Sequence, residues 1–257
     1  MKKLLIATLL FYSACIYGQS RLYTTANVHS HNNYEQTIPF WLAYNNGLGS
    51  IEADIFLENG ELLVAHERKE LVLHRTLKEY YLDRLQRCVD TNGSYPYADT
   101  SKKLQVLIDI KSDSIVTLDK LIDVLKEYPS LINNAKISFV ITGNRPATSL
   151  WGGYPSFIYF DGVLSETYPK EALQKIVMFS DNFKNYTQWN GKGAIPKKDR
   201  KHLLLLINKA HRAYKPVRFW NAPDFFSAWH RLMQLNVDYL NTDHIGTIAA
   251  FLRSLKK

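Results

Sequence analysis

Cysteine is scarce in this chain: among its 257 residues, only Cys15 and Cys88 are cysteines. Cys15 falls in a segment that we expect to be removed during export, so Cys88 would be left alone and no intramolecular disulfide could form. Neither cysteine has the spacing of a zinc-binding pair. The fold must therefore be stabilised by its hydrophobic core, which a chain of this size can bury.

A long apolar run is also missing. The apolar segment at residues 4–11 is too short to span a bilayer, which needs about 20 residues. It follows two lysines and precedes small residues that end at Gly18, the layout of a secretory signal peptide. We therefore predict a signal peptide at residues 1–18, a mature domain at residues 19–257, and an exported protein, periplasmic or secreted.

Two other interpretations of the amino-terminal segment stay open. It could form a buried strand of the fold. Alternatively, Tyr12-Ser13-Ala14-Cys15 loosely resembles a lipoprotein processing site, in which case Cys15 would carry a lipid anchor.

A continuous basic tract is the third absence. The net charge is +8, and +6 once the two lysines of residues 1–18 are removed, yet the basic residues form only short clusters such as Lys197-Lys198. A basic excess favours an anionic substrate or a membrane surface. Without a long basic tract we predict no nucleic-acid partner, and peripheral membrane contact stays open. The oligomeric state is not indicated by the sequence.

The chain shows no internal repeat and no low-complexity segment. Short apolar segments alternate with longer amphipathic ones, which is typical of buried parallel strands connected by helices. Eight candidate strands in one domain fit a barrel better than an open sheet, so we predict an α/β fold, a single TIM-type (β/α)8 barrel. The candidate strands are residues 25–29, 49–57, 104–110, 136–141, 157–160, 176–179, 217–220 and 237–241.

A small hairpin insertion is predicted after the second strand. Asn59-Gly60 is a favoured two-residue turn, and apolar residues flank it on both sides. Residues 61–66 would then form an extra arm that ends at His66. Longer polar loops are predicted at residues 90–101 and 186–199, where glycine and proline interrupt the pattern.

Three acidic residues lie on strands that are otherwise apolar. Glu52 and Asp54 are two apart and so share a face of their strand, and burial of both is costly unless a cation pairs with them. Asp109 ends an apolar strand, at the edge where barrel active sites lie. The three suit one divalent cation, because hard cations prefer carboxylate oxygens. The alternatives are an exposed acidic pair for the first two and a helix cap for Asp109.

Histidines end two of the predicted strands. His31 follows the first strand and His66 ends the hairpin arm, and imidazoles of near-neutral pKa suit general acid and base catalysis. Lys111, two residues beyond Asp109, could face the same site and hold a phosphate oxygen. A structural role is the alternative for each.

Taken in order, these motifs resemble the superfamily of glycerophosphodiester phosphodiesterases and phosphatidylinositol-specific phospholipase C-like barrels. The first motif differs from that of the commoner hydrolases of the superfamily, which begin with His-Arg-Gly, because this chain has His31-Asn32-Asn33-Tyr34. It is closest to a branch whose first motif is His-Ser-His-Asn. The segments that carry the resemblance are residues 31–32, 39–54, 60–66, 107–111, 217–221 and 237–243.

The resemblance implies a metal-dependent phosphoric diester hydrolase that acts on a glycerophosphodiester or a phospholipid. It implies His31 and His66 as the catalytic pair, one Mg²⁺ or Ca²⁺ as cofactor, and hydrolysis or closure of a cyclic phosphate as the reaction. The implied metal ligands are Glu52, Asp54 and Asp109, and the implied substrate contacts are Asn32, Lys111 and Trp220.

Two rival functions remain. His29-x-His31 on a first strand also opens amidohydrolase-type barrels and barrels of the polymerase and histidinol phosphatase type, where both histidines bind metal. Candidate strands 136–141 and 157–160, however, lack the histidines that amidohydrolases need. The second rival is a non-catalytic barrel that binds a phosphorylated ligand.

Overall fold

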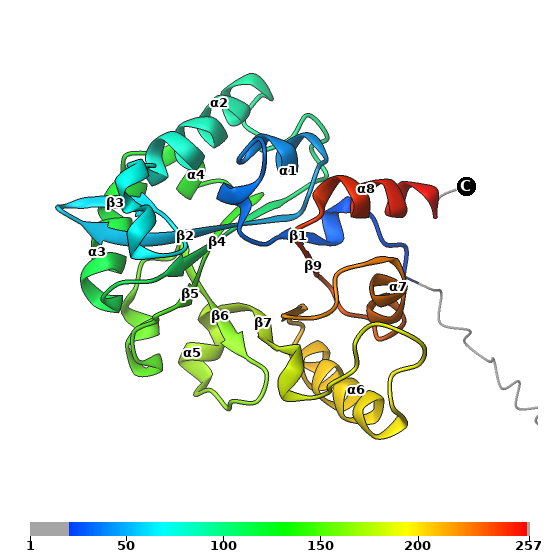
Figure 1. The fold of residues 1–257 in the computed structure, drawn as a ribbon. Helices are drawn as coiled ribbons and strands as arrows, with labels where there is room; N and C mark the ends of the chain where they lie inside the picture. The colour runs from blue at the N-terminus through cyan, green and yellow to red at the C-terminus, as the bar shows by residue number, and fades with distance from the viewer. Residues whose placement is uncertain (1–20, 256–257) are drawn as a thin grey trace, which may run out of the picture.

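The computed structural model describes residues 21–255, so the predicted signal peptide and Cys15 lie outside the described residues. Eight parallel strands form a ring, and one further strand pairs outside it (Figure 1). The ring strands are β1 (Val28–Ser30), β2 (Ser50–Glu58), β4 (Leu104–Ile110), β5 (Ile137–Gly143), β6 (Ile158–Val163), β7 (Ile176–Asn182), β8 (Val217–Trp220) and β9 (Leu240–Thr242). The predicted TIM-type barrel is confirmed.

The ring closes between its last strands. From β2 to β8, each ring strand pairs with the next ring strand along the chain, and β1 pairs with both β2 and β9. Between β8 and β9, the backbone N–H groups of Asp238 and Tyr239 donate to the carbonyl of Val217, at 2.9 and 3.1 Å. These bonds satisfy the strand edges that an open sheet would leave unpaired.

Helices cover the outside of the ring (Figure 1). A π-helical turn, Lys78–Leu82, precedes the second of them. The helices are α1 (Trp41–Asn45), α2 (Asp83–Thr91), α3 (Ser114–Lys126), α4 (Pro129–Ile132), α5 (Lys170–Lys175), α6 (Lys197–Arg212), α7 (Phe226–Gln234) and α8 (Ile245–Ser254). None of the described helices is both long and apolar enough to cross a membrane.

The predicted hairpin is present. Strand β3 (Glu61–Val64) pairs antiparallel with the end of β2, and Asn59 and Gly60 form the turn with φ of 49° and 83°. Both residue types tolerate this left-handed backbone. The hairpin returns the chain to the barrel, where the Ala65 N–H donates to the Asp54 carbonyl at 3.2 Å. His66 is thereby placed beside Asp54.

Some predicted boundaries differ from the structure. The first strand begins three residues later than predicted, because Thr24 caps a 3-10 turn over Thr25–Asn27 by accepting a hydrogen bond from the Ala26 N–H. Strands β5, β6 and β7 extend two or three residues further, because their polar ends stay paired inside the ring. Pro129 begins the short helix α4, since proline fits the first helical turn.

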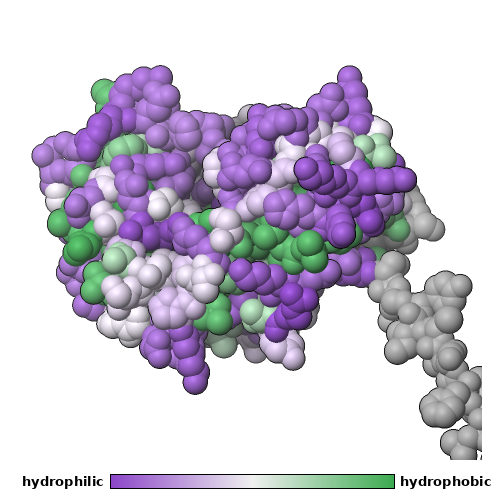
Figure 2. Space-filling view, turned by 90° about the horizontal axis from the view of Figure 1, so that it is seen from below, coloured by the Kyte–Doolittle hydropathy of each residue, from purple (hydrophilic) through white to green (hydrophobic). Residues whose placement is uncertain are grey.

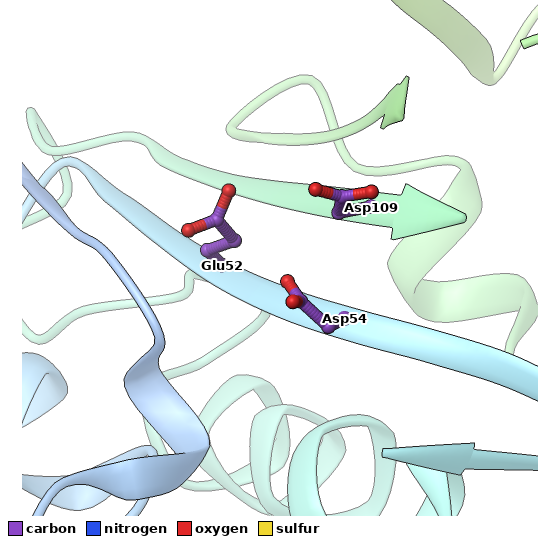
Figure 3. Close-up of side chains that lie close together, drawn as sticks. All are labelled: Glu52, Asp54 and Asp109. Carbon is purple, nitrogen blue, oxygen red and sulfur yellow. The ribbon is translucent and has the colours of Figure 1, made fainter. Parts of the chain in front are cut away.

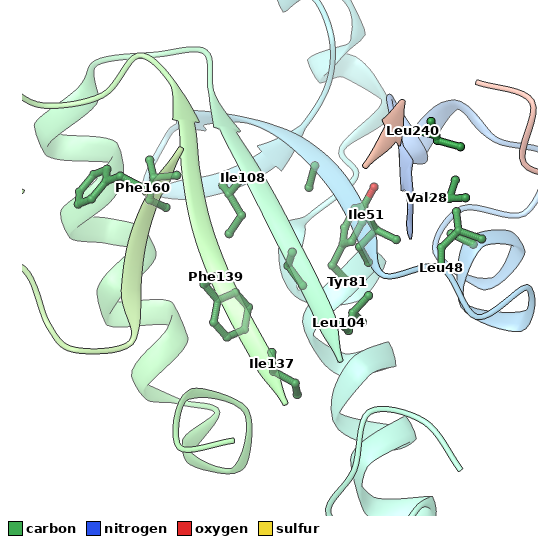
Figure 4. Close-up of a cluster of buried hydrophobic side chains, with 14 of the residues drawn as sticks. Val28, Leu48, Ile51, Tyr81, Leu104, Ile108, Ile137, Phe139, Phe160 and Leu240 are labelled. Atoms are coloured by element: carbon green, nitrogen blue, oxygen red, sulfur yellow. The ribbon is translucent and has the colours of Figure 1, made fainter. Parts of the chain in front are cut away.

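Side-chain alternation along the strands separates two interiors. Residues such as Ile51, Ile108 and Phe139 point out of the ring and pack in the main core between strands and helices (Figure 4). Inside the ring, Leu107, Val140 and Met178 form a small apolar layer. The flank over α5 and α6 is mainly hydrophilic, with a hydrophobic band across it (Figure 2). The inward positions beyond the inner layer, toward the carboxyl ends of the strands, are polar and form the candidate site.

Candidate active site and metal centre

Three carboxylates converge at the carboxyl end of neighbouring strands. Glu52 and Asp54 are two residues apart on β2, and Asp109 on β4 lies opposite Asp54 in the register. Figure 3 shows all three side chains projecting into the same space from the two strands. Each offers an oxygen within 4.8 Å of the others, and Glu52 and Asp54 are buried. The predicted metal ligands are therefore brought together by the fold.

The cluster fits a hard divalent cation. The ammonium of Lys111 lies 3.0 Å from Asp54 Oδ2 and 2.8 Å from Asp109 Oδ2. The Oδ1 atoms of both aspartates are buried and have no hydrogen-bond partner among the described residues. A buried oxygen without a donor is costly, and a cation that accepts several carboxylate oxygens removes that cost.

The electrostatic environment of Asp54 also favours a bound cation. Burial, together with the charges of Glu52 and Asp109, raises the pKa of Asp54 to about 6. Burial likewise raises the pKa of Asp109, although Lys111 opposes this effect. Two carboxyl groups that hold protons this strongly lack sufficient positive charge nearby. An added cation would supply it.

Glu52 has the opposite environment. Burial alone would raise its pKa, but contact with His29 and the charge of Arg218 lower it well below the usual range. Arg218 Nη1 lies 3.7 Å from Glu52 Oε1, and the backbone N–H of Asn32 donates to Glu52 Oε2 at 3.2 Å. Glu52 is thus held ionised and oriented before any cation binds.

His31 follows β1 and reaches the cluster from the side. Its Nδ1 lies 2.9 Å from Asp243 Oδ1, and its Nε2 lies 3.9 Å from Glu52 Oε2. Burial would lower the pKa of His31, but the hydrogen bond to Asp243 and the charge of Glu52 outweigh it and raise the pKa. Asp243 fixes the ring, so Nε2 is the nitrogen directed toward the carboxylates.

His66 approaches from the hairpin. Its Nδ1 lies 3.2 Å from Asp54 Oδ2 and 3.3 Å from the Tyr34 hydroxyl. Since both contacts are made at Nδ1, Nε2 remains for a proton transfer. The two histidines therefore flank the carboxylate cluster, one beside Glu52 and one beside Asp54.

The three residues predicted to contact substrate have different surroundings. Lys111 lies on the carboxylates described above, and Trp220 is 40% exposed at the end of β8. The side-chain oxygen of Asn32 accepts a hydrogen bond from Tyr34 at 3.2 Å, so its observed contacts orient Tyr34 and Glu52. Contact of these residues with a phosphate stays a prediction.

A cavity of about 400 Å³ opens above the carboxylates. Its walls add several residues that the sequence analysis did not single out, chiefly Arg218 and Asp161, which form an ion pair with Nη2 and Oδ2 3.7 Å apart. Arg145 also lines it and donates to the Asp161 carbonyl. The signal that could have found them is a charged residue between apolar neighbours on a strand, as in Val217-Arg218-Phe219.

A larger cavity, of about 910 Å³, opens at the opposite end of the barrel. It is lined by residues that precede strands, such as Thr25, Gly49 and Lys103. Chemistry in this architecture occurs at the carboxyl ends of the strands, and the smaller cavity is there. The smaller cavity is lined by Glu52 and Asp109 of the acidic cluster and by both predicted catalytic histidines, so we take it as the candidate site.

His29 is held in the barrel interior. Its Nδ1 lies 2.8 Å from Ser50 Oγ and its Nε2 lies 2.7 Å from Arg218 Nη1, and the ring is fully buried. Burial and the charge of Arg218 lower the pKa of His29 to about 4. With both nitrogens engaged and a guanidinium beside Nε2, His29 does not have the surroundings of a metal ligand, as the amidohydrolase-type rival requires.

Curated proteins related in sequence cover most of this chain. Altered inheritance of mitochondria protein 6 from Eremothecium gossypii is 29% identical over 87% of this chain and 69% of its own length. A homologue from Arthroderma benhamiae is 27% identical over 87% of this chain and 83% of its own length.

Solved structures support the fold. A glycerophosphodiester phosphodiesterase from Parabacteroides distasonis superposes with a TM-score of 0.57 over 90% of this chain and 98% of its own, at 12% identity. A putative glycerophosphoryl diester phosphodiesterase from Agrobacterium tumefaciens gives 0.52 over 91% and 99%, also at 12% identity.

The family assignment follows from the sequence match. The profile of the AIM6-like phosphodiesterase domain matches residues 19–148, just over half of the chain, including both strands that carry the carboxylate cluster. The predicted resemblance to phospholipase C-like barrels is thereby confirmed. The chain therefore belongs to the AIM6-like phosphodiesterase domain family.

Proposed function

We propose that this protein is an exported hydrolase that cleaves a glycerophosphodiester or phospholipid-type substrate with one Mg²⁺ or Ca²⁺. The observation that carries the proposal is the cluster of Glu52, Asp54 and Asp109, flanked by His31 and His66 at the mouth of the cavity. A bound cation would stabilise the charge that develops on the non-bridging phosphate oxygens.

The protein side chains would supply the proton transfers. One of His31 and His66 accepts the proton of the attacking hydroxyl or water, and the other donates a proton to the leaving alkoxide. Asp243 and Asp54 hold the two rings through Nδ1, at 2.9 and 3.2 Å, which leaves Nε2 of each for the transfer.

Substrate binding would use Lys111 and Trp220, which line the same cavity as the carboxylates. Lys111 is the cation closest to the carboxylates, and a phosphate bound there would draw its ammonium away from Asp54 and Asp109. Trp220 offers an apolar face to the rest of the substrate. A cavity of about 400 Å³ suits a small head group better than a whole lipid, whose chains would stay outside.

Hydrolysis of a chromogenic phosphodiester by residues 19–257 tests the proposal. We expect turnover with added Mg²⁺ or Ca²⁺, loss of turnover with chelator, and a decrease of about 10²–10⁴-fold in His31→Ala and His66→Ala. His230→Ala is the matched control, because this exposed histidine lies on α7 and, among the described residues, its side chain is hydrogen-bonded to Gln234 alone. Its activity should equal that of the wild type.

The binding-only rival predicts a different result. If no substrate is turned over but calorimetry shows a divalent cation bound by the wild type and not by Glu52→Gln, the barrel binds a phosphorylated ligand without catalysis. If neither turnover nor metal binding is found, the proposal is wrong. Cell fractionation of the full chain beside Cys15→Ser would test export and separate a free protein from a lipid-anchored one.

A further inference from the structure

Exposed apolar side chains gather at the end of the barrel that carries the site. The described residues include thirteen large hydrophobic side chains that are exposed. Nine of them lie at the carboxyl end of a strand or in the turns and first helical turn that follow it; the four exceptions are Leu22, Leu205, Tyr214 and Leu255. Single exposed apolar residues need no explanation, but their concentration at one end of a soluble domain indicates an interaction surface.

The aromatic members are adjacent to the cavity. Trp220 ends β8 and lines the cavity, and Phe225 and Phe226 begin the next helix, with exposures of 40%, 38% and 55%. Asn221 reverses the chain between them with a φ of 56°. Tryptophan and phenylalanine partition to the boundary between water and a lipid bilayer.

A basic segment packs against these aromatics. Residues 184–201 carry six exposed basic side chains, and the acid among them, Asp199, accepts a hydrogen bond from Thr187 at 2.7 Å. Ser227 Oγ donates to the Gly191 carbonyl at 2.8 Å, and a side chain at position 191 would overlap the Phe225 ring. The basic residues are Lys184, Lys192, Lys197, Lys198, Arg200 and Lys201.

The basic side chains are available to a partner. Within the part of the chain that the structure describes, none of the six has a carboxylate oxygen within 4.0 Å, whereas lysines elsewhere, such as Lys78 and Lys126, are paired. The same segment reaches the cavity, because Asn185 Nδ2 donates to Asp181 Oδ1 at 3.1 Å and Asp181 lines the cavity wall. The basic segment and the exposed aromatic side chains therefore lie next to each other beside the candidate site.

We propose that this basic–aromatic rim, residues 184–201 with Trp220, Phe225 and Phe226, docks the protein on an anionic lipid surface. Docking would turn the mouth of the cavity toward the lipid head groups. The identity of the substrate rests on the proposed function, whereas the membrane binding itself does not. Lysine and arginine are attracted to anionic lipid, and the aromatic rings insert among the head groups.

A bilayer fits this surface better than a folded protein does. The exposed apolar residues come from separate segments of the chain, such as the first turn of α3, the turn after β3 and the connection from β8 to α7, rather than from one element. A fluid surface accommodates separate projecting side chains, whereas a protein interface needs a continuous complementary core. An acidic protein partner is the competing occupant, and the experiment below distinguishes it.

Cosedimentation with vesicles tests the proposal. Residues 19–257 should bind vesicles that contain phosphatidylglycerol, bind vesicles of pure phosphatidylcholine at least tenfold more weakly, and dissociate at high salt. The variant Lys197→Glu with Lys198→Glu should bind the anionic vesicles at least tenfold more weakly. Phe226→Ser should weaken binding at both low and high salt, and its melting curve checks that it is folded.

The matched control lies on the same helix. Lys209→Glu with Arg212→Glu makes the same change in net charge at the other end of α6, roughly 20 Å from Lys197 at 1.5 Å per residue. That distance is about two Debye lengths at 0.1 M salt. We expect less than a threefold change in vesicle binding for this control.

The outcomes separate docking from catalysis. No vesicle binding, equal binding to neutral and anionic vesicles, or equal losses in both charge-reversal variants would refute the lipid-docking role of the rim. Of these results, the absence of vesicle binding would favour the acidic protein partner. Turnover of a soluble chromogenic phosphodiester should be unchanged in Lys197→Glu with Lys198→Glu. A wild type that binds vesicles but hydrolyses nothing would refute the proposed function and leave the docking surface intact.

Discussion

Removal of the buried guanidinium of Arg218 should destabilise the fold more than any other single charge change in the barrel interior. Arg218 on β8 is 4% exposed at its side chain and lies 3.7 Å from carboxylate oxygens of both Glu52 and Asp161. It also contacts His29 Nε2 at 2.7 Å and donates to Asn241 Oδ1 at 3.2 Å. No other described cation forms an ion pair with Asp161.

The magnitude follows from the buried partners. In Arg218→Met two carboxylates lose their counter-charge, and removal of one member of a buried ion pair costs about 3–5 kcal/mol. For a domain of this size, about 2–4 °C of melting temperature corresponds to each kcal/mol, so we expect a decrease of about 6–20 °C. A divalent cation beside Glu52 would replace part of the lost charge.

Thermal and urea denaturation in chelator measure the loss of stability, and the same measurements with saturating Mg²⁺ show how much stability the cation restores. Mg²⁺ should restore more stability to Arg218→Met than it adds to the wild type. The matched control is Arg68→Met, because Arg68 also pairs with a carboxylate, Glu58 at 3.5 Å, but is 68% exposed. Arg68→Met should lower the free energy of unfolding by about 0.5 kcal/mol or less. A loss below about 1 kcal/mol for Arg218→Met would refute the charge-neutralising role.

Two further predictions concern the same interior. Because the folded protein lowers the pKa of His29 from 6.5 to about 4, the unfolded chain binds the proton more readily. The contribution of His29 to stability is therefore complete above pH 6.5 and is lost as the pH falls toward 4. In chelator, the wild type should lose about 2 kcal/mol more than His29→Gln between pH 7 and pH 5 in urea titrations, and equal losses would contradict the assignment. Gly143→Ala should destabilise by about 1–3 kcal/mol, because φ is 69° and the added Cβ would overlap Asp109 Oδ1. It should also weaken binding of the proposed Mg²⁺ or Ca²⁺ in calorimetry, and an unchanged affinity for both ions would contradict Asp109 as a ligand.

The ring of strands was predictable because each strand carries its own signal. Residues 104–110 and 217–220 match β4 and β8 in full, since apolar residues on both faces leave little choice of structure. The ends of β6 and β7 were missed because Asp161 and Ser180 are polar, and a polar residue usually marks the end of a buried strand. Here they continue the strand because Ser180 donates to Asp161 inside the ring.

The site was predictable only where spacing revealed it. Glu52 and Asp54 stand two apart, and Asp109 ends a strand, so their convergence follows from strand geometry. Arg218 and Asp161 were missed because their partners lie on other strands, 57 residues apart in the sequence. A contact across the barrel depends on the order and stagger of the strands, which a single sequence does not specify.

The residue after His31 differs from the one in the commoner hydrolases, and the structure gives a reason for the difference. Asn32 stands where they have arginine, and its φ of 42° lies in the left-handed region, which asparagine adopts more readily than arginine. This turn directs the Asn32 N–H to Glu52 Oε2, at 3.2 Å. Positive charge beside Glu52 comes from Arg218 on β8. Because a buried arginine and a backbone donor together hold Glu52, its carboxylate stays ionised without an arginine at position 32.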